Sequence, residues 1–144
     1  MIEERLGCSI RDYFEQAGEQ SFRDLEEAVI DELTQSSEGI VATGGGVVLR
    51  AANRAHLRER SRVVYLNSSL DDLFLRVRHD AKRPLLQVAD PMSRLRELHA
   101  VRDPLYRQTA HFIIEAARPS ITGLVDMIMM KLELCLAAAP EKRV

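Results

Sequence analysis

The fold class is decided by the stretch IVATGGG, residues 40–46. Its first four residues are apolar or β-branched and are bounded by glycines on both sides, which is typical of a buried strand in a parallel sheet. Residues 63–66 and 111–114 are two more runs of this kind. Because helical patterns alternate with these runs, the sequence predicts an α/β fold in which a parallel sheet lies between helices, giving three layers.

The helices are predicted from apolar residues that recur every three or four positions. The first helical pattern ends at Gly18, and a charged helical stretch covers about residues 53–60. Serine and aspartate side chains accept hydrogen bonds from the free N–H groups of a first helical turn, so they mark where helices begin. The predicted starts are at Ser9, Ser21, Ser68-Ser69, Asp90-Pro91 and Ser120.

The 144 residues have the composition of a soluble globular domain, with 46% hydrophobic and 29% charged side chains. No linker or repeat divides them, so residues 1–144 are predicted to form a single domain. The net charge of -2 gives no basic excess, which disfavours a nucleic acid or an anionic membrane as partner. Charged residues interrupt the most apolar stretch, residues 121–139, so it is not expected to cross a membrane.

The cysteines and histidines lack the spacing of common metal and catalytic motifs. Cys8 and Cys135 lie far apart without a C-x-x-C pair, which argues against a disulfide framework or a zinc site and favours a cytoplasmic location. The four histidines form no H-x-x-x-H or H-E-x-x-H pattern. No metal-ligating residues are therefore predicted, and without a G-x-S-x-G motif a hydrolase nucleophile is not supported.

Gly44, Gly45 and Gly46 follow the first predicted strand, at the carboxyl end where parallel sheets bind ligands. Glycine has no Cβ, so a ligand can touch the backbone here and meet its N–H groups. A flexible turn between a strand and a helix is the alternative, and the glycines alone leave it open.

Three arginine-containing motifs place positive charge along the chain. Arg23 and Glu26 are one helical turn apart, so the carboxylate can hold the guanidinium toward an anionic ligand; a surface ion pair is the alternative. Arg83 lies in a basic loop, preceded by Arg76, of the kind that closes over phosphates; a solvated charge run is the alternative. Arg102 lies in a helical pattern and predicts nothing by itself.

Four motifs occur in one order, namely FRDLE at 22–26, VATGGG at 41–46, RPLL at 83–86 and RDPLY at 102–106. In this order and spacing the chain resembles the shikimate kinase family, small P-loop enzymes similar to nucleoside monophosphate kinases. The resemblance covers nearly the whole chain. It implies phosphorylation of the 3-hydroxyl of shikimate by ATP and Mg²⁺, a step toward the aromatic amino acids.

On the substrate side, the resemblance implies roles for residues of the first, second and fourth motifs. Arg23 and Arg102 would bind the shikimate carboxylate, and Glu26 would orient Arg23. Gly44, Gly45 and Gly46 would line the substrate beside the γ-phosphate.

On the nucleotide side, the resemblance implies that Arg83 would reach the transferring phosphoryl group and that Arg76 would lie against adenine. Cations near the developing charge suit phosphoryl transfer, which depends mainly on positioning. A P-loop also needs G-x-x-x-x-G-K-[ST] to hold the phosphates and Mg²⁺, and the sequence contains no such motif. Residues 39–46 come nearest, with glycines where the lysine and the hydroxyl residue are required.

Relative to the family, a βα unit of about thirty residues is expected to be missing ahead of Met1. Its strand would lie between residues 40–43 and 63–66, so its loss would leave backbone groups unpaired on both sides. We therefore expect a shortened domain that is poorly stable or that associates with itself through an open sheet edge. We also expect phosphoryl transfer by these 144 residues to be severely impaired.

Two other functions stay open on the sequence. A non-catalytic module would bind shikimate-type carboxylates through Arg23 and Arg102 without ATP chemistry. A related small-molecule kinase, such as a gluconate kinase, would act on another acceptor, although the FRDLE and RDPLY motifs favour shikimate.

Overall fold

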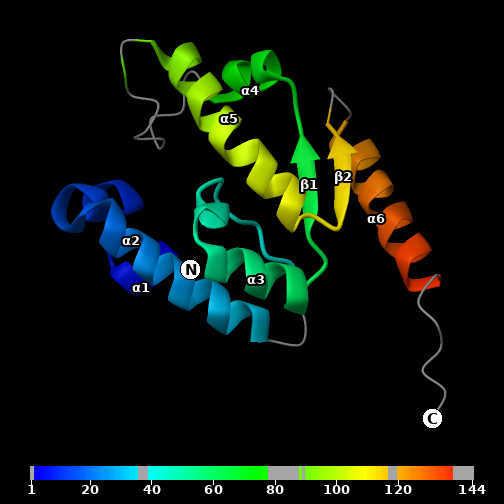
Figure 1. Ribbon diagram of the computed structural model, residues 1–144, viewed down its shortest axis with the longest axis horizontal. Helices are drawn as coiled ribbons and strands as arrows, with labels where there is room; N and C mark the ends of the chain where they lie inside the picture. The colour runs from blue at the N-terminus through cyan, green and yellow to red at the C-terminus, as the bar shows by residue number, and fades with distance from the viewer. Residues whose placement is uncertain (1, 36–38, 78–87, 89, 117–119, 138–144) are drawn as a thin grey trace.

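The computed structural model describes residues 2–35, 39–77, 88, 90–116 and 120–137 (Figure 1). The helices are interspersed with two strands that pair in parallel, so the α/β class is confirmed. In order, the elements are α1 (Ile2–Leu6), α2 (Ile10–Gln35), the 3₁₀ helix η1 (Val47–Leu49), α3 (Ala51–Arg60), β1 (Val64–Asn67), α4 (Leu70–Val77), α5 (Pro91–Thr109), β2 (Phe112–Glu115) and α6 (Ile121–Ala137).

The sheet consists of β1 and β2, which pair in parallel with Val64 opposite Phe112 and Asn67 opposite Glu115. Both strands begin one residue later than the sequence predicts, and both predictions are confirmed. Figure 1 shows α5 running beside β1 and α6 beside β2. Among the described residues, every helix is too short or too polar to cross a membrane.

The strand predicted at residues 40–43 is wrong, because these residues form no strand in the described chain. Ile40 is fully exposed and Val41 is also exposed. A strand exists only where a neighbour accepts and donates its backbone hydrogen bonds, and β1 and β2 pair only with each other. Residues 40–43 therefore have the residue types of a strand, but the described chain supplies no partner strand for them.

The first two predicted helices form one element, α2, with a kink at Gly18. Gly18 has φ 81° and ψ 168°, a conformation that favours glycine, so the predicted interruption is confirmed. Ser9 also caps as predicted: its Oγ accepts from the Asp12 N–H at 3.1 Å and donates to the Asp12 carboxylate at 2.7 Å. The kink lies four residues before Phe22, so the FRDLE segment belongs to the part of α2 that follows the kink.

The predicted caps of the three later helices are also present. Ser69, Asp90 and Ser120 each accept a backbone N–H three residues on, at 3.1 Å. These bonds satisfy donors that a first helical turn cannot satisfy by itself, which is why short-range sequence signals located the helices correctly.

The core lies where α2, η1 and α3 meet, and α5 packs on it from the side of the sheet (Figure 1). Its buried side chains are Ile30, Val47, Val48 and Leu57, with Val63, Leu105 and Tyr106 packed against them. Because η1 contributes two of the buried valines, the glycines directly before it are attached to the core.

His111 gives the fold a pH dependence. Its Nδ1 accepts the Val63 N–H at 3.1 Å, and its pKa is lowered from 6.5, first by burial and then by the charges of Arg58 and Arg62. The unfolded chain therefore binds the proton more readily. We expect the free energy of unfolding to fall as the pH drops below 6.5, by at most about 1.4 kcal/mol per pH unit, in urea titrations between pH 7.5 and 5.

His111→Asn is the matched variant for this prediction, since its side-chain oxygen can accept the same N–H and does not titrate. The variant should lose most of the decline between pH 6.5 and 5. An equal decline in both proteins would show that His111 does not cause it.

Candidate functional site

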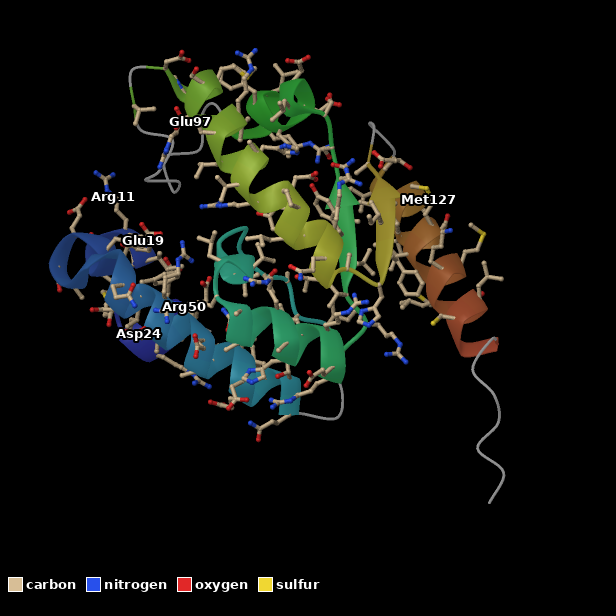
Figure 2. The ribbon with its side chains drawn as sticks, viewed as in Figure 1. Arg11, Glu19, Asp24, Arg50, Glu97 and Met127 are labelled. Atoms are coloured by element: carbon tan, nitrogen blue, oxygen red, sulfur yellow. The ribbon has the colours of Figure 1, made fainter. Side chains whose placement is uncertain are left out.

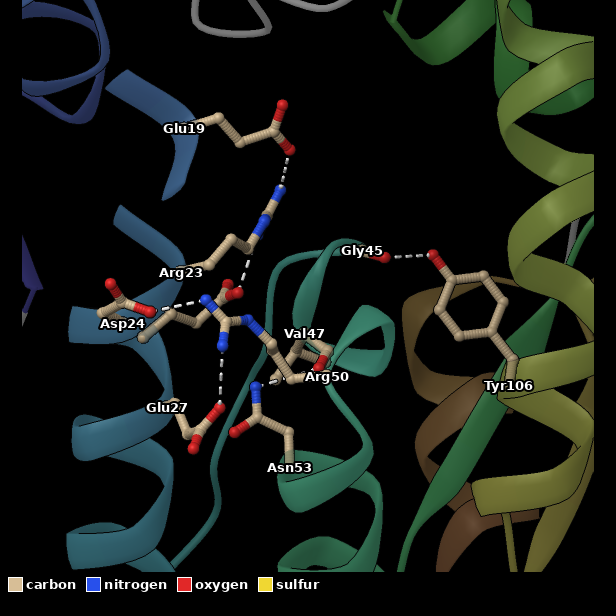
Figure 3. Close-up of polar contacts among 10 residues, drawn as sticks. Glu19, Arg23, Asp24, Glu27, Gly45, Val47, Arg50, Asn53 and Tyr106 are labelled. Atoms are coloured by element: carbon tan, nitrogen blue, oxygen red, sulfur yellow. Dashed lines mark hydrogen bonds and ion pairs between the residues drawn. The ribbon is translucent and has the colours of Figure 1, made fainter. Parts of the chain in front are cut away.

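The three glycines form a ridge with a fixed conformation. The Gly44 and Gly46 carbonyls accept the Val47 and Leu49 N–H groups at 3.2 and 3.1 Å. The Gly45 carbonyl accepts the hydroxyl of Tyr106, a residue of α5, at 2.6 Å (Figure 3). All three carbonyls are hydrogen-bonded, so the backbone of Gly44 to Gly46 is held in one conformation. We call this segment the glycine ridge.

The turn behind the glycine ridge is fastened to both neighbouring helices (Figure 3). Arg50 Nη2 lies 2.5 Å from Asp24 Oδ1, and Arg50 Nη1 lies 3.6 Å from Glu27 Oε2, both on α2. From α3, the buried Asn53 donates its Nδ2 hydrogen to the Val47 carbonyl at 3.0 Å. These contacts limit movement of η1 and of the glycines that precede it.

Arg23 and Glu26 form a buried ion pair on α2. The two residues are 7% and 6% exposed, and Arg23 Nη1 lies 2.6 Å from Glu26 Oε2. Arg23 Nη2 lies 3.2 Å from Glu19 Oε1, and the guanidinium carbon lies 5.3 Å from the centre of the Phe22 ring. Their burial separates this pair from an ordinary surface ion pair and holds the guanidinium in one position.

The guanidinium of Arg23 lies directly against Gly46. A Cβ built on Gly46 would come within 2.6 Å of Arg23 Cζ, closer than real side-chain contacts allow. The Nε of Arg23 is buried and has no hydrogen-bond partner among the described residues. Two of the five N–H donors therefore face Glu26 and Glu19, and the other donors are not committed to those carboxylates.

Arg102 reaches the same ridge from α5. A Cβ on Gly45 would lie 3.5 Å from Arg102 Nη1 and 2.8 Å from the Tyr106 hydroxyl oxygen. Two guanidinium groups that are 79 residues apart in sequence, one from α2 and one from α5, thus meet at adjacent glycines. An anionic group placed between the two guanidinium groups would gain from both charges at once.

A cavity of about 340 Å³ opens between α2, η1 and α5 beside Arg102. Figure 2 shows Glu19 on α2 and Glu97 on α5. The lining residues are Glu19, Leu49, Arg94, Glu97, Leu98, Val101 and Arg102. Because Glu19 also contacts Arg23, the cavity is adjacent to both guanidinium groups.

A second cavity, of about 300 Å³, lies between α2 and residues 41–44. Its walls include Val29, Ile30, Leu33 and Val41, and Glu26 is also part of the lining. It is mainly apolar, and it adjoins the residues that were wrongly predicted as a strand.

Of the two residues predicted on the nucleotide side, the structure describes only Arg76. Arg76 is exposed in the last turn of α4 and takes no part in the hydrogen bonds that hold the glycine ridge. Arg83 lies outside the described residues.

Two residues of the site, Glu19 and Tyr106, were not singled out from the sequence. Glu19 is four residues before Arg23 on one helix, and opposite charges at this spacing commonly form an ion pair, so the sequence did contain a signal for it. Tyr106 contacts Gly45 across 61 positions, and no local pattern predicts such a contact.

Charged neighbours and burial shift the pKa values of Asp103 and Tyr65, two residues near Tyr106. The guanidinium of Arg107, 2.8 Å from Asp103 Oδ2, lowers the pKa of the Asp103 carboxyl. Burial raises the pKa of Tyr65, and the hydrogen bond from its hydroxyl to Asp103 Oδ1 at 2.9 Å raises it further. Asp103 is therefore an anion and Tyr65 a neutral donor across the physiological range.

Comparison with known proteins gives one consistent result. A family model described as shikimate kinase matches residues 1–133. A shikimate kinase of Ralstonia nicotianae is 53% identical over 139 residues, which span 96% of this chain and 73% of that protein. One of Paracidovorax citrulli is 55% identical over 137 residues, which span 93% and 75%.

Solved structures agree with the sequence comparison. The shikimate kinase of Acinetobacter baumannii, solved in complex with shikimate, is 38% identical with a TM-score of 0.87, covering 96% of this chain and 76% of that one. The shikimate kinase of Bacteroides thetaiotaomicron is 29% identical with a TM-score of 0.81, covering 92% and 79%.

Proposed function

The chain belongs to the shikimate kinase family, and we propose that it binds shikimate as the acceptor of a phosphoryl group from ATP. The observation that carries this proposal is the meeting of the Arg23 and Arg102 guanidinium groups at the glycine ridge. Shikimate carries one carboxylate on a carbon ring that also bears hydroxyl groups. Two guanidinium groups fixed at one place can form charge-assisted hydrogen bonds with that carboxylate.

In the proposed complex, Arg23 and Arg102 bind the shikimate carboxylate. The ion pair with Glu26 keeps Arg23 in place, and the guanidinium of Arg23 lies against Gly46, at the glycine ridge. The glycine ridge brings backbone close to the ligand, with no side chain in between. The 340 Å³ cavity next to Arg102 has room for a small ring compound.

The proposed reaction transfers the γ-phosphoryl group of ATP to the 3-hydroxyl of shikimate. The hydroxyl oxygen bonds to the γ-phosphorus, the bond from that phosphorus to the bridging oxygen of ADP breaks, and the hydroxyl proton is released. Arg83 is proposed to neutralise charge on the transferring group, and Arg76 to contact adenine. Such a reaction needs groups held in line and cations near the charge more than covalent catalysis.

We find no site for Mg²⁺ among the described residues. The described residues contain no group of three or more acidic, histidine or cysteine side chains that could hold a metal ion, and the sequence contains no G-x-x-x-x-G-K-[ST] motif. We therefore assign no step to Mg²⁺. We propose that residues 1–144 form a single domain that carries the shikimate side of the site.

The alternative that the sequence left open, a non-catalytic module that binds shikimate-type carboxylates, is not favoured, because the matching relatives are shikimate kinases. Titration calorimetry with shikimate and with its methyl ester, together with a coupled assay of ADP release, separates the two. The kinase proposal expects shikimate binding, a large loss of affinity for the ester, and slow but shikimate-dependent ADP release. Shikimate binding with no ADP release favours the module, and no binding of shikimate contradicts both.

Self-association is a further expectation for this chain. The edge of β1 that faces away from β2 has no partner strand among the described residues, and the large side chain of Leu66 in this strand is exposed. Open edges with apolar side chains pair with other chains. We expect sedimentation velocity to show dimers or larger species at micromolar concentration.

Leu66→Lys, a substitution in β1, should shift the sedimentation profile toward the monomer. Ile121→Lys is the matched control, because Ile121 is also exposed but lies in α6, next to β2. A monomeric unmodified chain, or equal effects of the two substitutions, would contradict association through this edge.

A further inference from the structure

Tyr106 joins α5 to the glycine ridge through a short hydrogen bond. Its hydroxyl donates to the Gly45 carbonyl at 2.6 Å, and its ring packs against the core cluster (Figure 3). No role in binding follows from the sequence for this residue, since the motif RDPLY pointed only to Arg102.

This hydrogen bond fixes the orientation of one peptide unit in the ridge. The peptide between Gly45 and Gly46 is planar, with its carbonyl and its N–H on opposite sides. When Tyr106 holds the Gly45 carbonyl, the Gly46 N–H must point away from α5. Gly46 is the residue against which Arg23 lies, so Tyr106 determines how the backbone is presented beside Arg23.

The position of Tyr106 relative to Arg102 is fixed by α5, the helix that carries both residues. The two residues are four apart on α5 and therefore lie on the same face of that helix. Both lie close to Gly45, with the hydroxyl oxygen and Arg102 Nη1 at 2.8 and 3.5 Å from a Cβ built there. Because α5 is a rigid element, fixing Tyr106 on Gly45 also fixes how far Arg102 is from the glycine ridge.

The ring of Tyr106 is held by a second tyrosine. The rings of Tyr65 and Tyr106 lie 4.9 Å apart at 37°. Tyr65 in turn donates to Asp103 Oδ1 at 2.9 Å, and Asp103 is held by Arg107 at 2.8 Å. These contacts return to α5, so the tyrosine ring has little freedom to move away from Gly45.

We propose that Tyr106 is a positioning residue for shikimate recognition, acting by setting the distance between Arg102 and the glycine ridge. The inference rests on the proposed function, because it assigns Arg102 to the substrate carboxylate. Without the hydroxyl, α5 can move relative to the ridge, and the two guanidinium groups no longer meet at one carboxylate.

The test measures the dissociation constants for shikimate and its methyl ester by calorimetry, in the full chain and in Tyr106→Phe. The variant removes one oxygen and keeps the ring. We expect shikimate to bind about tenfold more weakly, as the loss of one good hydrogen bond allows. The affinity for the ester, which offers no carboxylate, should change less than twofold, a difference that a merely structural role would not produce.

Thr109→Val is the matched control, because it also removes an α5 hydroxyl that donates to a carbonyl, that of Leu105 at 2.7 Å, and this acceptor lies outside the glycine ridge. It should lower the melting temperature as much as Tyr106→Phe does while leaving shikimate affinity within about twofold. In the Arg102→Met background, Tyr106→Phe should have no further effect on affinity, because the two residues act together.

The outcomes separate this inference from the proposed function. If the unmodified chain binds shikimate and Tyr106→Phe binds it equally well, the positioning role is wrong while the proposed function stands. Equal losses for shikimate and the ester, or additive effects with Arg102→Met, also overturn the positioning role. If the unmodified chain does not bind shikimate, the proposed function fails and this inference fails with it.

Discussion

Gly46→Ala is expected to weaken shikimate binding about 10- to 100-fold and to lower the free energy of unfolding by about 1–3 kcal/mol. The backbone of Gly46, with φ -85° and ψ -12°, is one that alanine adopts readily, so the effect does not come from backbone strain. It comes from the new methyl group, which would lie within 2.6 Å of Arg23 Cζ.

Arg23 cannot move aside without cost, although the end of an arginine is usually flexible. Its guanidinium is buried, with Glu26 at 2.6 Å on one nitrogen and Glu19 at 3.2 Å on the other. Moving it would break these charge-assisted hydrogen bonds and leave Glu26 buried without its cation. Either Arg23 or the glycine ridge must shift, and both are proposed to bind the substrate.

Gly44→Ala is the matched control, because a Cβ at that position meets nothing within 4 Å. Calorimetry with shikimate and urea titration of both variants make the comparison. Gly44→Ala adds a methyl group beside the ligand but not against Arg23, so it should weaken shikimate binding less than Gly46→Ala does and leave the free energy of unfolding nearly unchanged. A loss of affinity equal to that of Gly46→Ala would show that the ridge tolerates no side chain for some reason other than the position of Arg23.

Arg23→Met is expected to lower the free energy of unfolding by about 3–5 kcal/mol and to remove measurable shikimate binding. The substitution keeps most of the side-chain volume but leaves the Glu26 carboxylate buried without its partner. A buried charge without its counter-ion costs far more than the loss of an exposed pair. Urea titration monitored by circular dichroism measures the effect.

Two variants test whether burial is the cause. Arg11→Met breaks an exposed pair on the same helix, Arg11 with Glu15 at 3.1 Å, and should cost less than about 1 kcal/mol. Arg23→Met combined with Glu26→Leu should recover much of the lost stability and still fail to bind shikimate. Equal costs for Arg11→Met and Arg23→Met would contradict the burial argument.

Local signals in the sequence predicted most of the helices correctly. Ser9, Ser69, Asp90 and Ser120 cap where they were expected, because a cap depends on residues only two or three positions away. Gly18 interrupts α2 for the same kind of reason. Residues 40–43 failed because a strand depends on a partner elsewhere, and residue preferences alone cannot show whether that partner is present.

The candidate site was predictable only in part. The spacing of Arg23 and Glu26 indicated an ion pair, but its burial depends on how α2 packs and was not visible in the sequence. The approach of Arg102 to the glycines came from the order of motifs in a known family. The bond from Tyr106 to Gly45 had no sequence signal, since it joins two positions 61 residues apart that only the packing of α5 against η1 brings together.

The central claim is that one carboxylate is bound by two arginines at the glycine ridge, and a crystal structure of this chain with shikimate tests it most directly. We expect the shikimate carboxylate within hydrogen-bond distance of nitrogen atoms of both Arg23 and Arg102, beside Gly44 to Gly46. A carboxylate bound by neither arginine, or shikimate bound away from the ridge, would contradict the claim.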